Sequence, residues 1–91
     1  MTIATIKANN LLAGQHFFER ATMRFFQSRV FSTIYGGKYF VTSEINPSGE
    51  KRYTVREAID GGKRIVCQHF FHHETLANAK REARELSRGG K

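Results

Sequence analysis

The fold is decided by residues 36–71, which read GGKYFVTSEINPSGEKRYTVREAIDGGKRIVCQHFF. Three runs in this stretch, 38–45, 52–58 and 64–71, are rich in aromatic and β-branched residues, and the connections between them contain Gly, Pro, Asn, Asp and Ser. Runs of this composition form strands, and such connections form tight turns. The stretch therefore predicts an antiparallel meander of three strands.

Alternation along the predicted strands assigns side chains to the two faces of the sheet. In residues 52–58, Tyr53 and Val55 point one way, and Arg52, Thr54 and Arg56 point the other way. In residues 38–45 each face keeps one aromatic residue. We therefore expect a polar, basic stripe along one face of the sheet, with aromatic rings beside it.

The segment after the meander predicts the clearest helix of the chain. In residues 74–87, Thr75 is placed as the N-cap, and small and aliphatic residues recur at helical spacing, namely Leu76, Ala79, Ala83 and Leu86. The Gly-Gly pair at 89–90 is a helix stop. This C-terminal helix is expected to pack on one face of the sheet.

The segments before the meander give weaker patterns. A short helix is predicted to begin near Glu19, with Phe18, Met23 and Phe26 on one face, and residues 28–35 alternate as a fourth strand. Residues 1–15 show no period and are expected to form a flexible or loosely docked arm. The predicted fold class is thus a single α+β domain over residues 1–91, with a three- to four-stranded sheet, a C-terminal helix and a short N-terminal helix.

Composition excludes several classes of protein. The chain has 91 residues, and no run of 18 apolar residues that could cross a membrane. No signal peptide is recognised, so a cytoplasmic location is expected. Cys67 is the only cysteine, which excludes an intramolecular disulfide and a Cys-rich zinc module.

Residues that could carry catalysis or bind a metal are concentrated in one segment, where Cys67 is followed by His69, His72 and His73. Their spacing matches no paired zinc pattern, and strand neighbours two positions apart stand about 7 Å apart at the backbone, which disfavours a direct Cys–His pair. Cys67 is therefore interpreted as a small buried apolar residue. We expect no metal, no cofactor and no catalytic residue, with a small metalloprotein or hydrolase as the last-ranked alternative.

Charge is the strongest functional signal. Fifteen Lys and Arg against eight Asp and Glu give a net charge of +7, which favours a polyanionic or acidic partner. The candidate binding residues are the cations of the predicted sheet and C-terminal helix, namely Arg29, Lys38, Arg52, Arg56, Lys80, Arg81, Arg84 and Arg88. Nucleic acid and an acidic host protein complex are both open as partners. Pairing of an edge strand, 28–35 or 64–71, with a second copy would give a homodimer.

Three segments, TMRFFQSRV, GGKYFVTSE and RYTVREA, resemble small uncharacterised proteins of phages, plasmids and other mobile elements over about residues 17–83. The resemblance implies an accessory protein acting in the host cytoplasm, either on nucleic acid or as an inhibitor of a host defence system, as anti-CRISPR proteins are. The strand, strand, strand, helix order is also similar to the arm-site DNA-binding domains of phage integrases, which insert a three-stranded sheet into the major groove. That likeness is architectural, and it implies a sheet that contacts DNA through Lys38, Arg52, Thr54 and Arg56.

Overall fold

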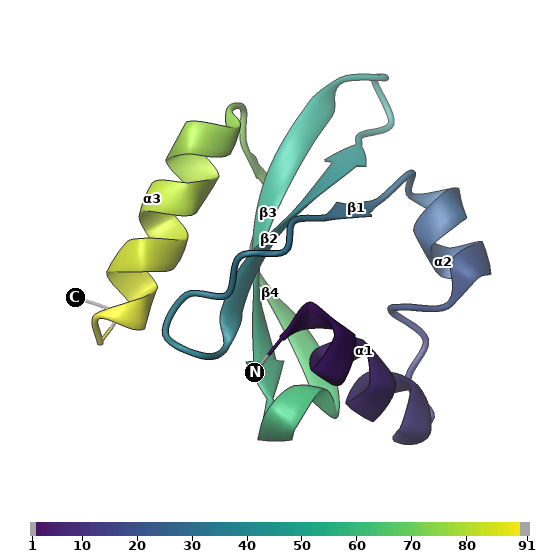
Figure 1. The fold of residues 1–91 in the computed structure, drawn as a ribbon. Coiled ribbons are helices and arrows are strands. Elements are labelled where there is room, and N and C mark those ends of the chain that lie inside the picture. Colours follow the sequence, from purple (N-terminus) through teal and green to yellow (C-terminus); the bar gives the residue numbers. More distant parts are fainter. Residues whose placement is uncertain (1, 90–91) are drawn as a thin grey trace.

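The computed structural model describes residues 2–89, with the side chains of residues 68–72 left aside. Its elements are α1 (Ile3–Leu12), α2 (Arg20–Phe25), β1 (Arg29–Val30), β2 (Tyr39–Ile45), β3 (Lys51–Ile59), the 3₁₀ turn η1 (Asp60–Gly62), β4 (Arg64–His73) and α3 (Leu76–Ser87). The strands form one antiparallel sheet in the order β1-β2-β3-β4. The predicted α+β meander with its two flanking helical regions is confirmed (Figure 1).

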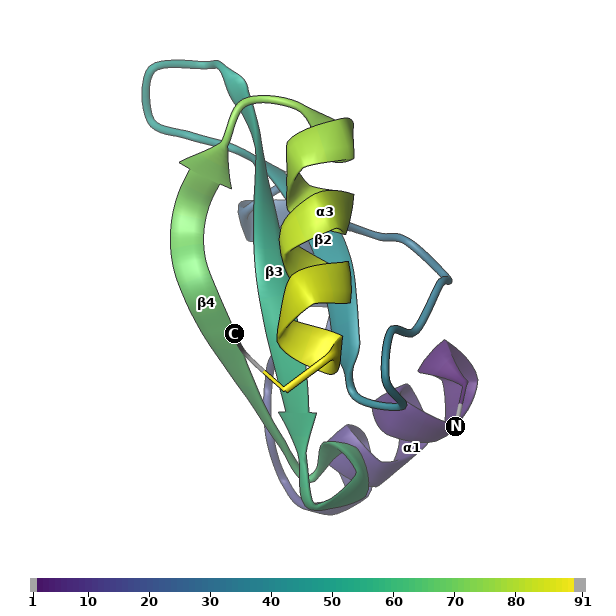
Figure 2. The same ribbon diagram turned by 90° about the vertical axis from the view of Figure 1, so that its left-hand side faces the viewer.

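The sheet is the middle of three layers. In Figures 1 and 2, α3 covers one face, and α1 and α2 lie on the opposite side. On the α3 side, Tyr39, Val41 and Val55 pack with Ala79 and Ala83. The two alanines are fully buried, because a side chain of one carbon lets the helix approach the strands closely.

The second face carries a smaller core. Phe40 of β2 and Ala58 of β3 pack there with Ile6 of α1 and with Phe18, which precedes α2. The rings of Phe18 and Phe40 stack with their centroids 6.4 Å apart. The alternation predicted from sequence is therefore correct for both strands, and each face of the sheet has its own apolar cluster.

The expectation of a flexible or loosely docked arm at residues 1–15 is wrong for residues 3–12, which form α1 with Ile6 and Asn10 buried. The hydroxyl of Thr2 caps the helix by accepting from the N–H of Thr5. Asn9 and Asn10 donate side-chain hydrogen bonds to the carbonyls of Gly61 and Gly62 at 2.7 and 3.0 Å. The helix is thus fixed to η1 in part by polar contacts, which apolar periodicity does not reveal.

The fourth strand is shorter than predicted. Only Arg29–Val30 form β1, and one further bond runs from the N–H of Phe31 to the carbonyl of Val41. The chain pairs with β2 again at the isolated bridge between Tyr35 and Tyr39. The reversal there uses two glycines with positive φ, at positions 36 and 37, which is the conformation that glycine adopts at least cost.

Candidate partner-binding surfaces

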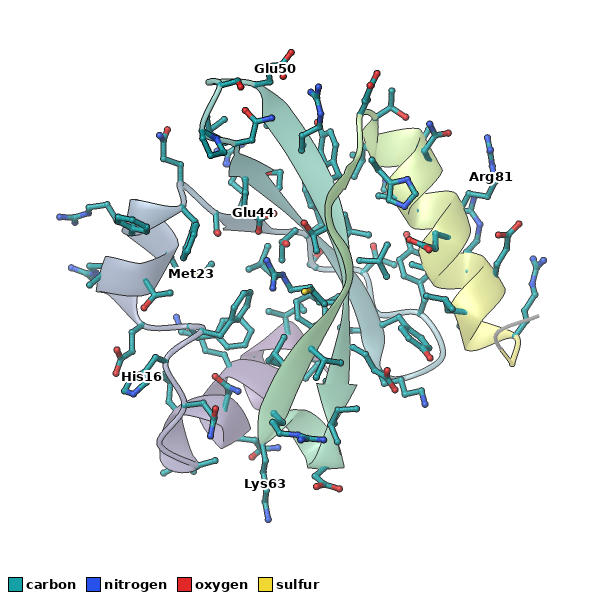
Figure 3. All side chains as sticks on the ribbon, turned by 180° about the vertical axis from the view of Figure 1, so that it is seen from behind. His16, Met23, Glu44, Glu50, Lys63 and Arg81 are labelled. Atoms are coloured by element: carbon teal, nitrogen blue, oxygen red, sulfur yellow. The ribbon has the colours of Figure 1, made fainter. Side chains whose placement is uncertain are left out.

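One surface is the outer face of α3. Thr75 caps the helix by accepting from the N–H of Asn78 at 3.2 Å, as predicted. With Ala79 and Ala83 against the sheet, helical geometry places Arg81, Arg84 and Arg88 together on the solvent side at spacings of three and four residues. All three are exposed, and Figure 3 shows Arg81 directed away from the sheet.

These arginines differ in their surroundings from Lys38, Arg52 and Arg56, which are paired with carboxylates. Among the side chains that the structure describes, none forms an ion pair with Arg81, Arg84 or Arg88. Glu82 points to the flank of α3, where its carboxylate lies 2.7 Å from Nε2 of His73. We call Lys80, Arg81, Arg84 and Arg88 the α3 basic surface.

Three candidate cations on or beside the sheet, Lys38, Arg52 and Arg56, are instead paired with carboxylates. Arg52 lies 3.1 Å from Glu50, and Lys38 lies 3.2 Å from Glu57. The hydrogen bond to Glu57, with the nearby charges of Tyr39 and Glu57, raises the pKa of Lys38. The basic stripe predicted along the sheet is therefore largely compensated.

Arg56 is placed most differently from the sequence-based expectation. It is only 8% exposed, because α1, α2 and the segment between them cover its face of the sheet. Its Nη2 lies 3.1 Å from Oε2 of Glu44, its Nε donates to Thr42 at 2.9 Å, and the ring of Phe17 lies 4.5 Å from its Cζ. In this structure Arg56 is part of a buried polar network and not of an open surface.

The predicted binding residues are thus divided between two sides of the molecule. The register pairs Arg29 with Ser43, which shares its face with Val41 and hence with α3. Arg29 therefore lies on the same side of the sheet as the α3 basic surface. Arg52 and Arg56 lie on the α1 and α2 side, so the sequence-predicted set is not one continuous face.

The network around Arg56 was not predicted, although alternation placed Thr54 and Arg56 on the correct face. Glu44 is fully buried, and its carboxylate accepts from Thr54 Oγ1 at 2.9 Å and from Ser28 Oγ at 3.3 Å in addition to Arg56. Every polar atom of the Glu44 carboxylate is therefore partnered. Buried charges are tolerated when they are paired and hydrogen-bonded in this way.

A cavity of about 230 Å³ adjoins this network. We call it the α2 pocket, and its lining residues are Phe17, Thr22, Phe26, Ser28, Arg56 and Cys67. Two rings and one thiol form most of the wall, and hydroxyls and a guanidinium supply its polar part.

Cys67 is exposed, so the interpretation of this residue as a buried apolar side chain is wrong. It pairs with Arg56 in the sheet and therefore faces the α2 pocket. The side chains of His69 and His72 lie outside the described part of the chain. Among the described residues, no group of three His, Cys, Asp or Glu side chains is placed to hold a metal ion.

Comparison with known proteins adds a family assignment. A family of unknown function, DUF7447, matches residues 2–84. The chain belongs to this family. No curated protein and no solved structure matches the DUF7447 chain. Within its described residues, no helix is both long and apolar enough to span a bilayer.

Proposed function

We propose that this protein is a non-enzymatic accessory protein of a phage or another mobile element, and that it binds nucleic acid through the α3 basic surface. The observation that supports the proposal is a difference among the candidate binding residues. Lys38, Arg52 and Arg56 are paired with carboxylates, while Arg81, Arg84 and Arg88 share the outer face of α3 without an ion pair among the described side chains.

The chemistry of such a surface is the neutralisation of phosphates. Each guanidinium presents two parallel N–H donors to a phosphate, and binding releases counterions condensed on the nucleic acid. A stripe from Arg81 to Arg88 extends over about 10 Å at 1.5 Å per residue, enough for contacts to more than one phosphate. Phosphate contacts position a protein without reading bases, so binding independent of sequence is expected.

The test compares the salt dependence of binding in two variants that each lose three cations. One variant carries Arg81→Ala, Arg84→Ala and Arg88→Ala. The control carries Lys7→Ala, Lys51→Ala and Lys63→Ala, three exposed cations outside α3. Fluorescence anisotropy of a labelled 20-base-pair duplex is recorded between 50 and 200 mM salt.

The proposal predicts a large difference between the variants. Four phosphate contacts give a slope of log K against log salt near −3.6, or a loss of about 150-fold over this range. The α3 variant should keep a slope of about −1, and the control should retain most of the original slope. Binding that does not respond to salt, or equal losses in both variants, would contradict the assignment to α3.

A second candidate function is inhibition of a host defence complex by protein binding. It is favoured by the apolar surface near α2, where Phe25 is 79% exposed and Phe26 is 37% exposed. The two functions are separated by affinity capture from a bacterial lysate treated with nuclease. A protein target stays bound after this treatment, whereas material held by nucleic acid is lost.

A further inference from the structure

The sheet ends in a long strand with one open side. β4 covers ten residues, Arg64–His73, and pairs with β3 alone in the sheet order. In Figures 2 and 3 no described element lies outside it. An edge strand presents backbone N–H and C=O groups that can pair with an added strand.

The α2 pocket lies beside the regular part of this edge. β4 pairs residue by residue with β3 from Arg64 to Gln68, and the register becomes irregular beyond that point. Cys67 lies within the regular part and also lines the pocket. Residues opposite each other on neighbouring strands share a face, so a side chain placed opposite Cys67 on an added strand would point toward the pocket.

The size and lining of the pocket indicate what such a side chain would be. A dry cavity of roughly 150 Å³ is enough to bind benzene, whereas sites for drug-sized molecules measure roughly 300–1,000 Å³. The volume of about 230 Å³ therefore suits one aromatic ring with its methylene. The rings of Phe17 and Phe26 offer edges and faces for aromatic contacts.

Charge distinguishes a protein segment from a nucleotide as the occupant. Among the described residues that line the pocket, Arg56 alone is charged, and Glu44 already compensates it at 3.1 Å. The described lining thus provides no uncompensated cation for a phosphate. The sequence of β4 contains no Asp or Glu, and the exposed Lys63 and Arg64 lie at its start, which complements acidic residues in a partner.

We propose that β4 accepts an extended segment of a protein partner as a fifth strand, and that the α2 pocket receives an aromatic side chain of this segment, with acidic residues flanking it. The site lies on the opposite side of the sheet from α3 and does not depend on nucleic-acid binding. It rests on the second candidate function, for which it names the interface.

The experiment selects ligands from a displayed library of random 12-residue peptides, and the enriched peptide is then synthesised. We expect an aromatic residue with Asp or Glu beside it. Alanine in place of the aromatic residue should weaken binding about tenfold to a hundredfold, since burying one large side chain supplies about that factor. The peptide should also slow hydrogen exchange of β4 amides.

Two substitutions at one position locate the peptide. Cys67→Phe fills the pocket and should weaken binding about tenfold or more, whereas Cys67→Ser keeps it open and should change binding by less than about threefold. Circular dichroism and the melting temperature establish whether both variants are folded. A second readout uses the wild-type protein, in which bound peptide should slow the reaction of the Cys67 thiol with Ellman's reagent.

Several results would overturn the proposal. The first is a selection that enriches no peptide, and the second is a peptide whose affinity is unchanged when its aromatic residue is replaced. The third is a peptide whose affinity is unchanged by Cys67→Phe and which does not slow the reaction of the Cys67 thiol. Displacement of the peptide by an oligothymidylate of eight nucleotides would assign the pocket to nucleic acid instead. If the Cys67→Phe variant still captures the same host protein as the wild type, the second candidate function is supported, but the α2 pocket is not the site of binding.

Discussion

The buried pair of Glu44 and Arg56 allows a quantitative prediction for the substitution Glu44→Gln. This change keeps the shape of the side chain and leaves the Arg56 guanidinium, 8% exposed, without its carboxylate. Removing one partner of a buried ion pair typically costs about 3–5 kcal/mol, and the hydrogen bonds from Ser28 and Thr54 are weakened at the same time. We expect a loss of at least about 3 kcal/mol in the free energy of unfolding.

Such a loss is large for a chain of this size. One kcal/mol lowers the melting temperature of a domain of 60–100 residues by about 4–8 °C, so Glu44→Gln should lower it by about 12–24 °C. Urea denaturation followed by circular dichroism measures the free energy, and calorimetry measures the melting temperature. The matched control is Glu50→Gln, because Glu50 pairs with Arg52 at the same 3.1 Å distance but its side chain is 57% exposed.

The control should lose less than about 1 kcal/mol, since exposed ion pairs contribute about 0–1 kcal/mol. The double variant Glu44→Leu, Arg56→Met should be more stable than Glu44→Gln, because no buried charge is left unpaired. The reasoning would be refuted if Glu44→Gln lost less than about 1 kcal/mol, or if the double variant were as unstable as the single one.

Two further predictions concern the turn at η1 and the ion pair between Lys38 and Glu57 at the start of β2. Gly62 has φ of +105°, and a Cβ at this position would lie 2.8 Å from the carbonyl oxygen of Ile6, so Gly62→Ala should displace α1. Gly62→Ala should therefore lower the melting temperature more than the control Gly14→Ala, because a Cβ at position 14 would meet nothing within 4 Å. The second substitution is Lys38→Gln. Because the pKa of Lys38 is raised in the folded state, its stabilising contact with Glu57 is fully present below pH 10.5 and is lost as the pH rises through the higher folded pKa. The difference in melting temperature between Lys38→Gln and wild type should therefore be constant near neutral pH and shrink above pH 10.5.

Sequence reasoning succeeded where structure depends on local patterns. The strands, the two faces of β2 and β3, and α3 with its Thr75 cap all follow from period, turn residues and capping chemistry. It failed for α1, because Asn9 and Asn10 hold that helix through carbonyls more than 50 positions away. A polar residue that makes a distant tertiary contact has no local signature.

The candidate site shows the same division between local and distant information. Alternation placed Arg56 and Thr54 on one face of the sheet, but it could not show that α1, α2 and Phe17 cover this face. Alternation alone therefore predicts an exposed Arg56, whereas the structure buries it. The arginines of α3 were found correctly as an outward group, because their exposure follows from the apolar stripe of their own helix.

The buried network explains how a short helix with no buried residue of its own is held in place. Within the described chain, α2 has no fully buried side chain, and Phe18 just before it supplies the nearest apolar anchor. Phe17 lies over Arg56 at one end of this segment, and Ser28 bonds Glu44 at the other end. Because hydrogen bonds and ring contacts to fixed charges are directional, they define the distance of α2 from the sheet more sharply than apolar contact alone would. That distance sets the width of the α2 pocket, so the ion pair between Glu44 and Arg56 and the pocket form one structural unit. Loss of this ion pair should therefore change the shape of the pocket even where the sheet and α3 remain folded.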